Sequence, residues 1–131
     1  MEGSLRELAG YRMERAKEML DAAKGNLEIG QFKTSLNRSY YAIFHAMRAA
    51  NILNGFDSSK HSGVIAFFNK KYLKEGILER GLSIIIKNSS FLREKSDYDD
   101  FFIASKKDAE RQVEDAAIFV EKVDAYIKQQ K

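Results

Sequence analysis

Apolar residues recur at steps of three and four along most of this chain, and no proline interrupts them. Such spacing places side chains on one face of an α-helix, and the absence of proline removes the commonest helix breaker. The sequence therefore predicts an all-α protein. The clearest stripe lies in a long helix expected from about residue 103, with steps of 4-3-4-3-4: Ala109, Val113, Ala116, Val120, Val123 and Ile127.

Glycines separate the expected helices in the first half of the chain. We expect one helix over about residues 4–28, closed by Gly30, and a second over about 31–54. The second ends at Asn54 and Gly55, a pair typical of a left-handed helix C-cap.

A short third helix and a fourth helix are expected between the second and the last. Ser58 and Ser59 offer capping hydroxyls for the third, and the fourth follows Gly76. The run at 82–86 is rich in β-branched residues, but a helix is favoured because no second strand is available to pair with it. Residues 95–101 are expected to form a loop. With no linker or repeat, we expect one domain over residues 1–131, a five-helix antiparallel bundle-like fold.

Positive charge is concentrated in one part of the chain. Between residues 29 and 74 seven Lys or Arg residues face one acid, Asp57, whereas the whole chain has a net charge of only +3. Both histidines, His45 and His61, fall in this basic segment. The asymmetry favours an anionic partner, although basic residues that solvate helix faces would give the same count, and both interpretations stay open.

The expected second helix does not have the usual charged back. Its only charged residues are Lys33, Arg38 and Arg48, and apolar residues such as Phe44 lie outside its main apolar stripe. A helix that is apolar on most sides is buried on most sides. It is therefore either central in the bundle or packed against a second copy of the chain.

One face of this helix gathers the residues that carry chemistry. Arg38 and His45 are seven residues apart, which places them within about 20° of each other around the helix. Tyr41 lies between them, and Arg48 follows one turn after His45. A guanidinium and an imidazole on one face suit a phosphate. The structural alternatives are a salt bridge from Arg38 to one of the acids near residue 98, namely Asp97, Asp99 or Asp100, and a core histidine at position 45.

The string Leu-Asn-Arg-Ser-Tyr-Tyr-Ala-Ile-Phe-His-Ala over residues 36–46 resembles the small prokaryotic members of the HEPN domain family. The Ser-Asp-Tyr-Asp-Asp-Phe string over residues 96–101 is similar to the loop before their last helix. The resemblance implies a five-helix, dimeric module, often encoded beside a minimal nucleotidyltransferase as a toxin–antitoxin pair. It also implies an Arg-x(4–6)-His motif for metal-independent RNA cleavage, which Arg38 and His45 match with six intervening residues.

RNA cleavage without a metal needs a base for the 2′-hydroxyl, an acid for the leaving 5′-oxygen and positive charge at the phosphate. Histidine suits the proton transfers because its ordinary pKa is about 6.5. Arg38 would hold the scissile phosphate. Because one His45 cannot easily fill both roles, we expect a homodimer in which the second helices meet and line a shared cleft.

Further nucleotide- or RNA-binding residues are expected on the same helix, namely Asn37, Tyr41 and Arg48. Tyr41 is favoured for stacking on a base, whereas Tyr40 lies on the apolar stripe and is expected in the core. Lys60, His61, Lys70 and Lys71 could extend a basic rim, with His61 more simply interpreted as an exposed loop histidine.

Other classes of function find little support in the sequence. Cysteine is absent, which excludes disulfides and thiolate chemistry, and no metal-binding spacing or cofactor motif is present, so we expect no metal and no cofactor. The aspartates at 97–100 are interpreted as turn chemistry. Without an apolar span or signal peptide we expect a cytoplasmic protein. Three functions remain: a toxin-like ribonuclease, a non-catalytic nucleotide- or RNA-binding module acting with a nucleotidyltransferase, and a structural dimerisation domain.

Overall fold

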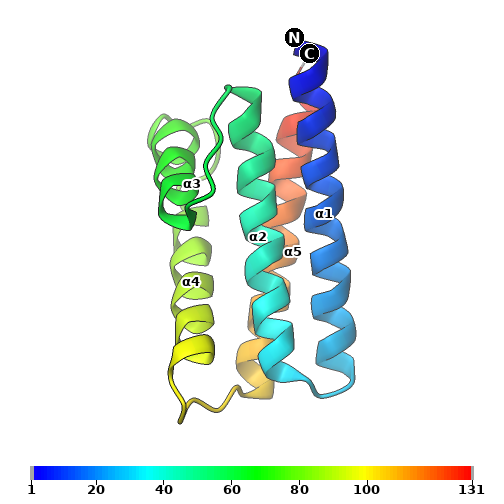
Figure 1. Cartoon of the computed structure of the whole chain (residues 1–131), viewed down its shortest axis with the longest axis vertical. Helices are drawn as coiled ribbons and strands as arrows, with labels where there is room; N and C mark the ends of the chain where they lie inside the picture. Colours follow the sequence, from blue (N-terminus) through cyan, green and yellow to red (C-terminus); the bar gives the residue numbers. More distant parts are fainter. Residues whose placement is uncertain (1, 131) are drawn as a thin grey trace.

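The computed structural model describes residues 2–130, and its long helices lie side by side with alternating direction (Figure 1). No strand occurs in this range, so the predicted all-α, five-helix antiparallel bundle is confirmed. None of the described helices is both long enough and apolar enough to cross a membrane. The helices are α1 (Glu2–Glu28), α2 (Phe32–Leu53), α3 (His61–Phe68), α4 (Leu82–Tyr98) and α5 (Lys106–Gln129), and a π-helical segment, η1 (Asn69–Lys74), continues α3.

Helix α2 is the central element of the bundle. It packs against α1, α3, α4 and α5, and Figure 1 shows it between α1 on one side and α3 and α4 on the other. Its many apolar sides are therefore covered by helices of the same chain. The core that results is filled by large side chains from α2, α3, η1 and α5, including Ile43, Met47, Val64, Phe68, Tyr72, Phe119 and Val123.

The predicted end of α2 is confirmed in detail. Gly55 has a φ of +75°, which residues with a Cβ rarely adopt. The amide of Gly55 donates to the carbonyl of Ile52, and the amide of Phe56 donates to that of Asn51. These two hydrogen bonds form a Schellman motif. The loop after α2 therefore leaves the helix in a fixed direction, back along α2 towards α3.

Helix starts were predicted less well. The N-cap of α3 is Lys60, which makes no capping hydrogen bond, whereas the Ser58 hydroxyl accepts from the Lys60 amide in the preceding turn. The predicted capping role of Ser58 and Ser59 is therefore wrong. Helix α5 begins at Lys106, and the Ser105 hydroxyl caps it by accepting from the amide of Asp108.

Helix α4 extends further than expected. Residues 82–86 are helical as predicted, with Leu82 and Ile86 buried and Ile84 exposed. The predicted loop over 95–101 is wrong for its first four residues, since the helix continues to Tyr98. Ion pairs one turn apart, from Arg93 to Asp97 and from Lys95 to Asp99, support this last turn.

Candidate nucleic-acid interface

The partly exposed side of α2 carries the polar residues that the sequence singled out. Asn37, Arg38, Tyr41, His45 and Arg48 are all partly exposed, whereas most of the residues between them are buried. We call these five residues the α2 strip. Helical spacing places them along one side of the helix, because they follow one another at steps of one, three, four and three residues.

Arg38 has no acidic partner within the described residues. Its only side-chain hydrogen bond there runs from Nη1 to Oδ1 of Asn37, at 2.6 Å. The alternative of a salt bridge to the acids near residue 98 is wrong. Asp97 pairs with Arg93, and Asp99 pairs with Lys95 and accepts from the Phe101 amide, which also accounts for part of the predicted turn chemistry.

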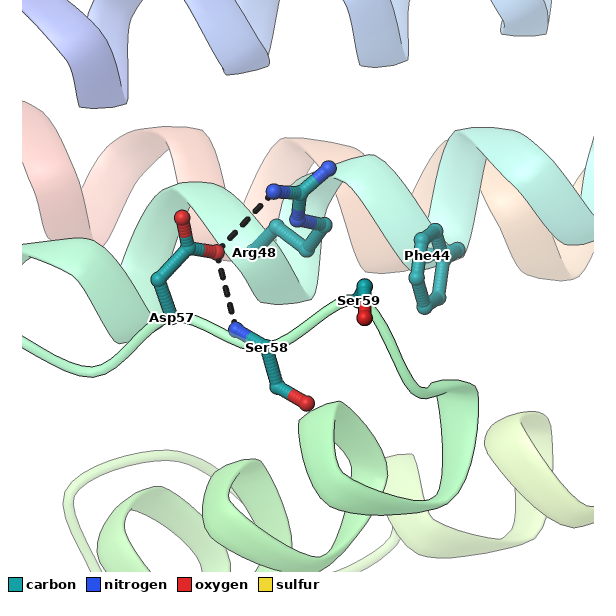
Figure 2. A pocket seen from close by; sticks show the side chains of 5 residues that line it. All are labelled: Phe44, Arg48, Asp57, Ser58 and Ser59. Atoms are coloured by element: carbon teal, nitrogen blue, oxygen red, sulfur yellow. Dashed lines mark hydrogen bonds and ion pairs between the residues drawn. The ribbon is translucent and has the colours of Figure 1, made fainter.

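Arg48, at the other end of the α2 strip, does have an acidic partner. Its Nη2 lies 2.9 Å from Oδ1 of Asp57, and Nη2 of Arg12 on α1 lies 3.0 Å from Oδ2 of the same carboxylate. Figure 2 shows Arg48 and Asp57 facing each other from α2 and the loop after it. Hydrogen bonds from Arg12 and then from Arg48 lower the pKa of Asp57 to about 2.

An open pocket of about 470 Å³ adjoins this ion pair. Figure 2 shows its lining, with Phe44 and Arg48 from α2 and Asp57, Ser58 and Ser59 from the loop. The lining offers two hydroxyls and the guanidinium of Arg48 as polar groups, beside the largely buried ring of Phe44. Asp57 was visible in the sequence as the only acid of the basic segment, but its role as a bridge to α1 was not.

His45 is not a core histidine among aliphatic side chains. Its ring packs near Tyr41 and Phe44, with ring centroids 6.2 and 5.9 Å away, and it remains partly exposed. Burial lowers the pKa of His45 to about 4, and the positive charges of Arg15, Arg48 and Arg12 add to this effect. His45 is therefore uncharged at neutral pH.

The two tyrosines divide as the sequence predicted. Tyr40 is only 2% exposed and belongs to the core, whereas Tyr41 is partly exposed on the α2 strip. Arg93 of α4 lies over both rings, at 5.1 Å from the centroid of Tyr40 and 5.8 Å from that of Tyr41. Its Nη2 also lies 3.4 Å from the Tyr41 hydroxyl. Arg93 lies 52 residues from Tyr41 in the chain, so helical spacing in the sequence gave no sign of this contact.

His61 is not the exposed loop histidine that was expected. It is the first residue of α3 and is partly buried against α2, with its ring centroid 4.3 Å from that of Phe44. Its Nδ1 lies 2.9 Å from the hydroxyl of Tyr40. Of the lysines proposed as a basic rim, Lys60 and Lys70 are exposed, and Lys71 lies 3.5 Å from Glu75.

Helices of the same chain cover the apolar sides of α2. The apolar character of this helix suggested either a central place in the bundle or a second copy, and the structure shows the central place. The apolar sides of α2 therefore give no support for a shared cleft between two second helices. Within residues 2–130, no three His, Cys, Asp or Glu side chains gather where they could hold a metal ion.

The fold and the α2 strip together define a class, an all-α bundle whose central helix exposes arginine, histidine and tyrosine along one side. The family model for the HEPN domain matches residues 9–126, so the chain belongs to the HEPN domain family.

Two relatives align over nearly their whole length. A Methanocaldococcus jannaschii protein named "Putative toxin MJ0605" is 33% identical over 125 residues, covering 95% of this chain and 92% of that protein. A Thermotoga maritima protein named "UPF0332 protein" is 30% identical over 117 residues, covering 89% of each. The crystal structure of TT1696 from Thermus thermophilus matches with a TM-score of 0.76 at 18% identity, over 90% of this chain and 97% of that one. It supports the fold.

Proposed function

We propose that this chain is a toxin-like HEPN module that cuts RNA without a metal ion, with Arg38 and His45 as its catalytic residues. One observation carries the proposal. Arg38, which has no acidic partner within residues 2–130, shares the exposed side of α2 with an imidazole that is neutral at physiological pH. The name of the M. jannaschii relative supports the toxin class.

The chemistry divides between these two residues. The neutral imidazole of His45 takes the proton of the 2′-hydroxyl, the 2′-oxygen bonds to phosphorus, and the bond from phosphorus to the 5′-oxygen breaks. Arg38 binds the phosphate and stabilises the charge that builds up on it. A water molecule gives a proton to the leaving 5′-oxygen, and the hydroxide that remains takes up the proton held by His45. The products end in a 2′,3′-cyclic phosphate and a 5′-hydroxyl.

The low pKa of His45 fits this scheme once RNA is bound. With a pKa of about 4 the free imidazole is a weak base. A bound phosphate offsets the positive field of the nearby arginines, which raises the pKa towards the range where proton transfer is efficient.

A second candidate function is a non-catalytic nucleotide- or RNA-binding module that acts with a nucleotidyltransferase partner. The observation that favours it is the same low pKa of His45, because an imidazole uncharged at pH 7 cannot donate a proton in the free protein. Asn37, Arg38 and Tyr41 would then bind the ligand, with no role for proton transfer.

We also propose that the chain works as a cytoplasmic homodimer of single-domain protomers. Support comes from α4, where the large side chains of Ile84, Phe91 and Tyr98 are exposed at intervals of seven residues. This spacing places three exposed apolar side chains along one side of α4, two helical turns apart, where a second copy could bury them. Replacing Phe91 with glutamate should convert a dimer to a monomer, as judged by light scattering after gel filtration. A wild-type protein that is monomeric at high concentration would contradict the dimer.

The nuclease proposal is tested by incubating purified, tag-free protein with a mixed RNA pool in EDTA. We expect fragments ending in 2′,3′-cyclic phosphate. Arg38→Ala and His45→Ala should each lower the rate of their formation by about 100-fold or more. Lys24→Ala is the matched control, because it removes an exposed positive charge from α1 and not from α2.

Two results would decide against cleavage. Activity that survives in His45→Ala would show that the nuclease activity does not come from this site. RNA that binds to the wild type, fails to bind to Arg38→Ala and is never cut would establish the binding-module alternative instead.

A further inference from the structure

His61 and His45 belong to the same small cluster of side chains. The Phe44 ring lies 4.3 Å from the ring of His61 and 5.9 Å from that of His45, and Tyr41 lies 5.8 and 6.2 Å from the same two rings. Both imidazoles therefore lie beside the same two aromatic side chains. They come from different helices, α3 and α2, of one chain.

The hydrogen bond between His61 and Tyr40 fixes which nitrogen of the imidazole carries its proton. Tyr40 is 2% exposed, and its hydroxyl has no other partner among the described residues. Burial raises the pKa of Tyr40 to about 12, so the phenol keeps its proton at neutral pH. A buried O–H must donate to an acceptor, and here the acceptor is Nδ1 of His61.

The opposite nitrogen of His61 is then a donor. Burial lowers the pKa of His61, and Arg93 acts in the same direction, so the ring is neutral at physiological pH. A neutral ring that accepts at Nδ1 carries its proton on Nε2. Nε2 has no hydrogen-bond partner within residues 2–130, and the side chain is partly exposed. This N–H group therefore has no acceptor within the described residues, and its ring lies beside Tyr41 of the α2 strip.

We propose that His61 is a second phosphate-contacting residue of the RNA site, and that Tyr40 is the positioning residue that holds it as the Nε2–H tautomer. This inference rests on the proposed function and deepens it. His61 donates to a phosphate oxygen while His45 acts on the 2′-hydroxyl. A protomer then supplies two imidazoles to one phosphodiester.

The tautomer is measured first, by NMR on protein with ¹⁵N-labelled histidine. The chain has only two histidines, so the spectrum is simple to assign with His45→Ala. We expect a protonated Nε2 and an unprotonated Nδ1 for His61 in the free protein. Adding a 2′-O-methylated, uncleavable oligonucleotide should shift the Nε2 resonance. Tyr40→Phe should lose the single tautomer.

Three outcomes of this measurement would overturn the inference. The first is a His61 ring that carries its proton on Nδ1. The second is a His61 signal that does not move when the oligonucleotide is saturating, and the third is an oligonucleotide that does not bind at all. Because the probe cannot be cut, the measurement decides the role of His61 even if the wild-type protein proves not to be a nuclease.

A pair of substitutions separates contact with phosphate from a structural role. His61→Gln places an amide N–H near the former Nε2, whereas His61→Asn keeps a polar group near the former Nδ1 for Tyr40 to bond. If Nε2–H contacts phosphate, His61→Asn should lower the single-turnover cleavage rate about 100-fold and His61→Gln should lower it less. The melting temperature of His61→Asn should stay near that of the wild type.

A larger loss of cleavage in His61→Gln than in His61→Asn would overturn the proposal. Cleavage at the wild-type rate by both variants would also overturn it. A loss in both variants that follows a fall in melting temperature would also overturn it, because that pattern marks a purely structural histidine. These results are distinct from failure of the proposed function, which is a wild-type protein that does not cut RNA or a His45→Ala variant that cuts it normally.

Discussion

Two arginines, Arg38 and Arg48, lie near the two ends of the α2 strip, and only Arg48 has an acidic partner within the described residues. Arg48 shares the carboxylate of Asp57 with Arg12, whereas Arg38 bonds only to the amide oxygen of Asn37. Both arginines are partly exposed on one helix, ten residues apart. The difference comes from a single acid in the loop after α2. It teaches that the number of basic residues on a surface does not give the number available to an anion.

His45 lies between these two arginines in the sequence, and the positive charge of Arg48 contributes to lowering its pKa. Burial lowers its pKa to about 4, and the nearby arginines add to this effect although Asp57 already compensates two of them. The roles of the two ends should therefore differ in experiments that replace Asp57, one of the two arginines or His45.

The largest difference is expected between the two arginine variants. Arg38→Ala should lower the single-turnover rate of RNA cleavage by about 100- to 1,000-fold, because it removes a preorganised donor at the phosphate. Arg48→Ala should lower it by about 10-fold or less, since this guanidinium is already bound to Asp57. Quenched-flow cleavage assays on both variants check this order. Equal losses would mean that Asp57 does not distinguish the two ends.

The next effect concerns the titration of His45. An NMR titration of the free protein should give a pKa of about 4, and saturation with an uncleavable oligonucleotide should raise it. Since the folded pKa lies below the unfolded value of about 6.5, His45 destabilises the fold progressively as the pH falls below 6.5, and fully below 4. The melting temperature of His45→Gln should therefore decline less with acid over that range. Identical acid profiles would contradict the assigned pKa.

Removing the negative charge of Asp57 should have a smaller effect, which is on the affinity for RNA. Asp57→Asn removes the negative charge that holds Arg12 and Arg48, so its affinity for single-stranded RNA should rise several-fold, which is about 1 kcal/mol. The control for the change in net charge is Asp21→Asn, which replaces an exposed aspartate on α1. Fluorescence anisotropy measures both. If the two variants gain equally, the effect is one of net charge and not of this ion pair.

The smallest effect is on stability. The ion pairs of Asp57 are partly exposed, and such pairs contribute about 0–1 kcal/mol each. Asp57→Asn should therefore lower the melting temperature by a few degrees at pH 7. Because the folded pKa of Asp57 is about 2, this contribution is present above its unfolded pKa near 4 and disappears as the pH falls towards 2. A difference that persists at pH 2 would exclude the ion pairs as its cause.

Residues related by helical geometry were predictable from the sequence. The stripe of α5 and the α2 strip follow from periodicity alone, and the Asn54–Gly55 end of α2 follows from glycine's access to positive φ. Tyr40 in the core and Tyr41 on the strip follow in the same way. None of these assignments required knowledge of how the helices pack.

The surroundings of the strip could not be predicted. Asp57 reaches Arg12 across 45 residues, His61 reaches Tyr40 across 21, and Arg93 reaches Tyr41 across 52. These contacts depend on the packing of α1, α3 and α4 around α2, which periodicity does not encode. The extension of α4 to Tyr98 was missed because polar residues dominate its last turn, where ion pairs one turn apart sustain the helix.

The carboxylate of Asp57 has a consequence for how RNA binding would respond to ionic strength. Salt weakens such binding because each phosphate neutralised by the protein releases counterions, with a slope of about 0.7 per phosphate for single strands. Arg12 and Arg48 already have a counterion that is part of the chain, so a phosphate beside them gains little neutralisation. Within the α2 strip only Arg38 would contribute a full increment. Binding here should therefore persist in salt better than the density of arginines on this surface suggests.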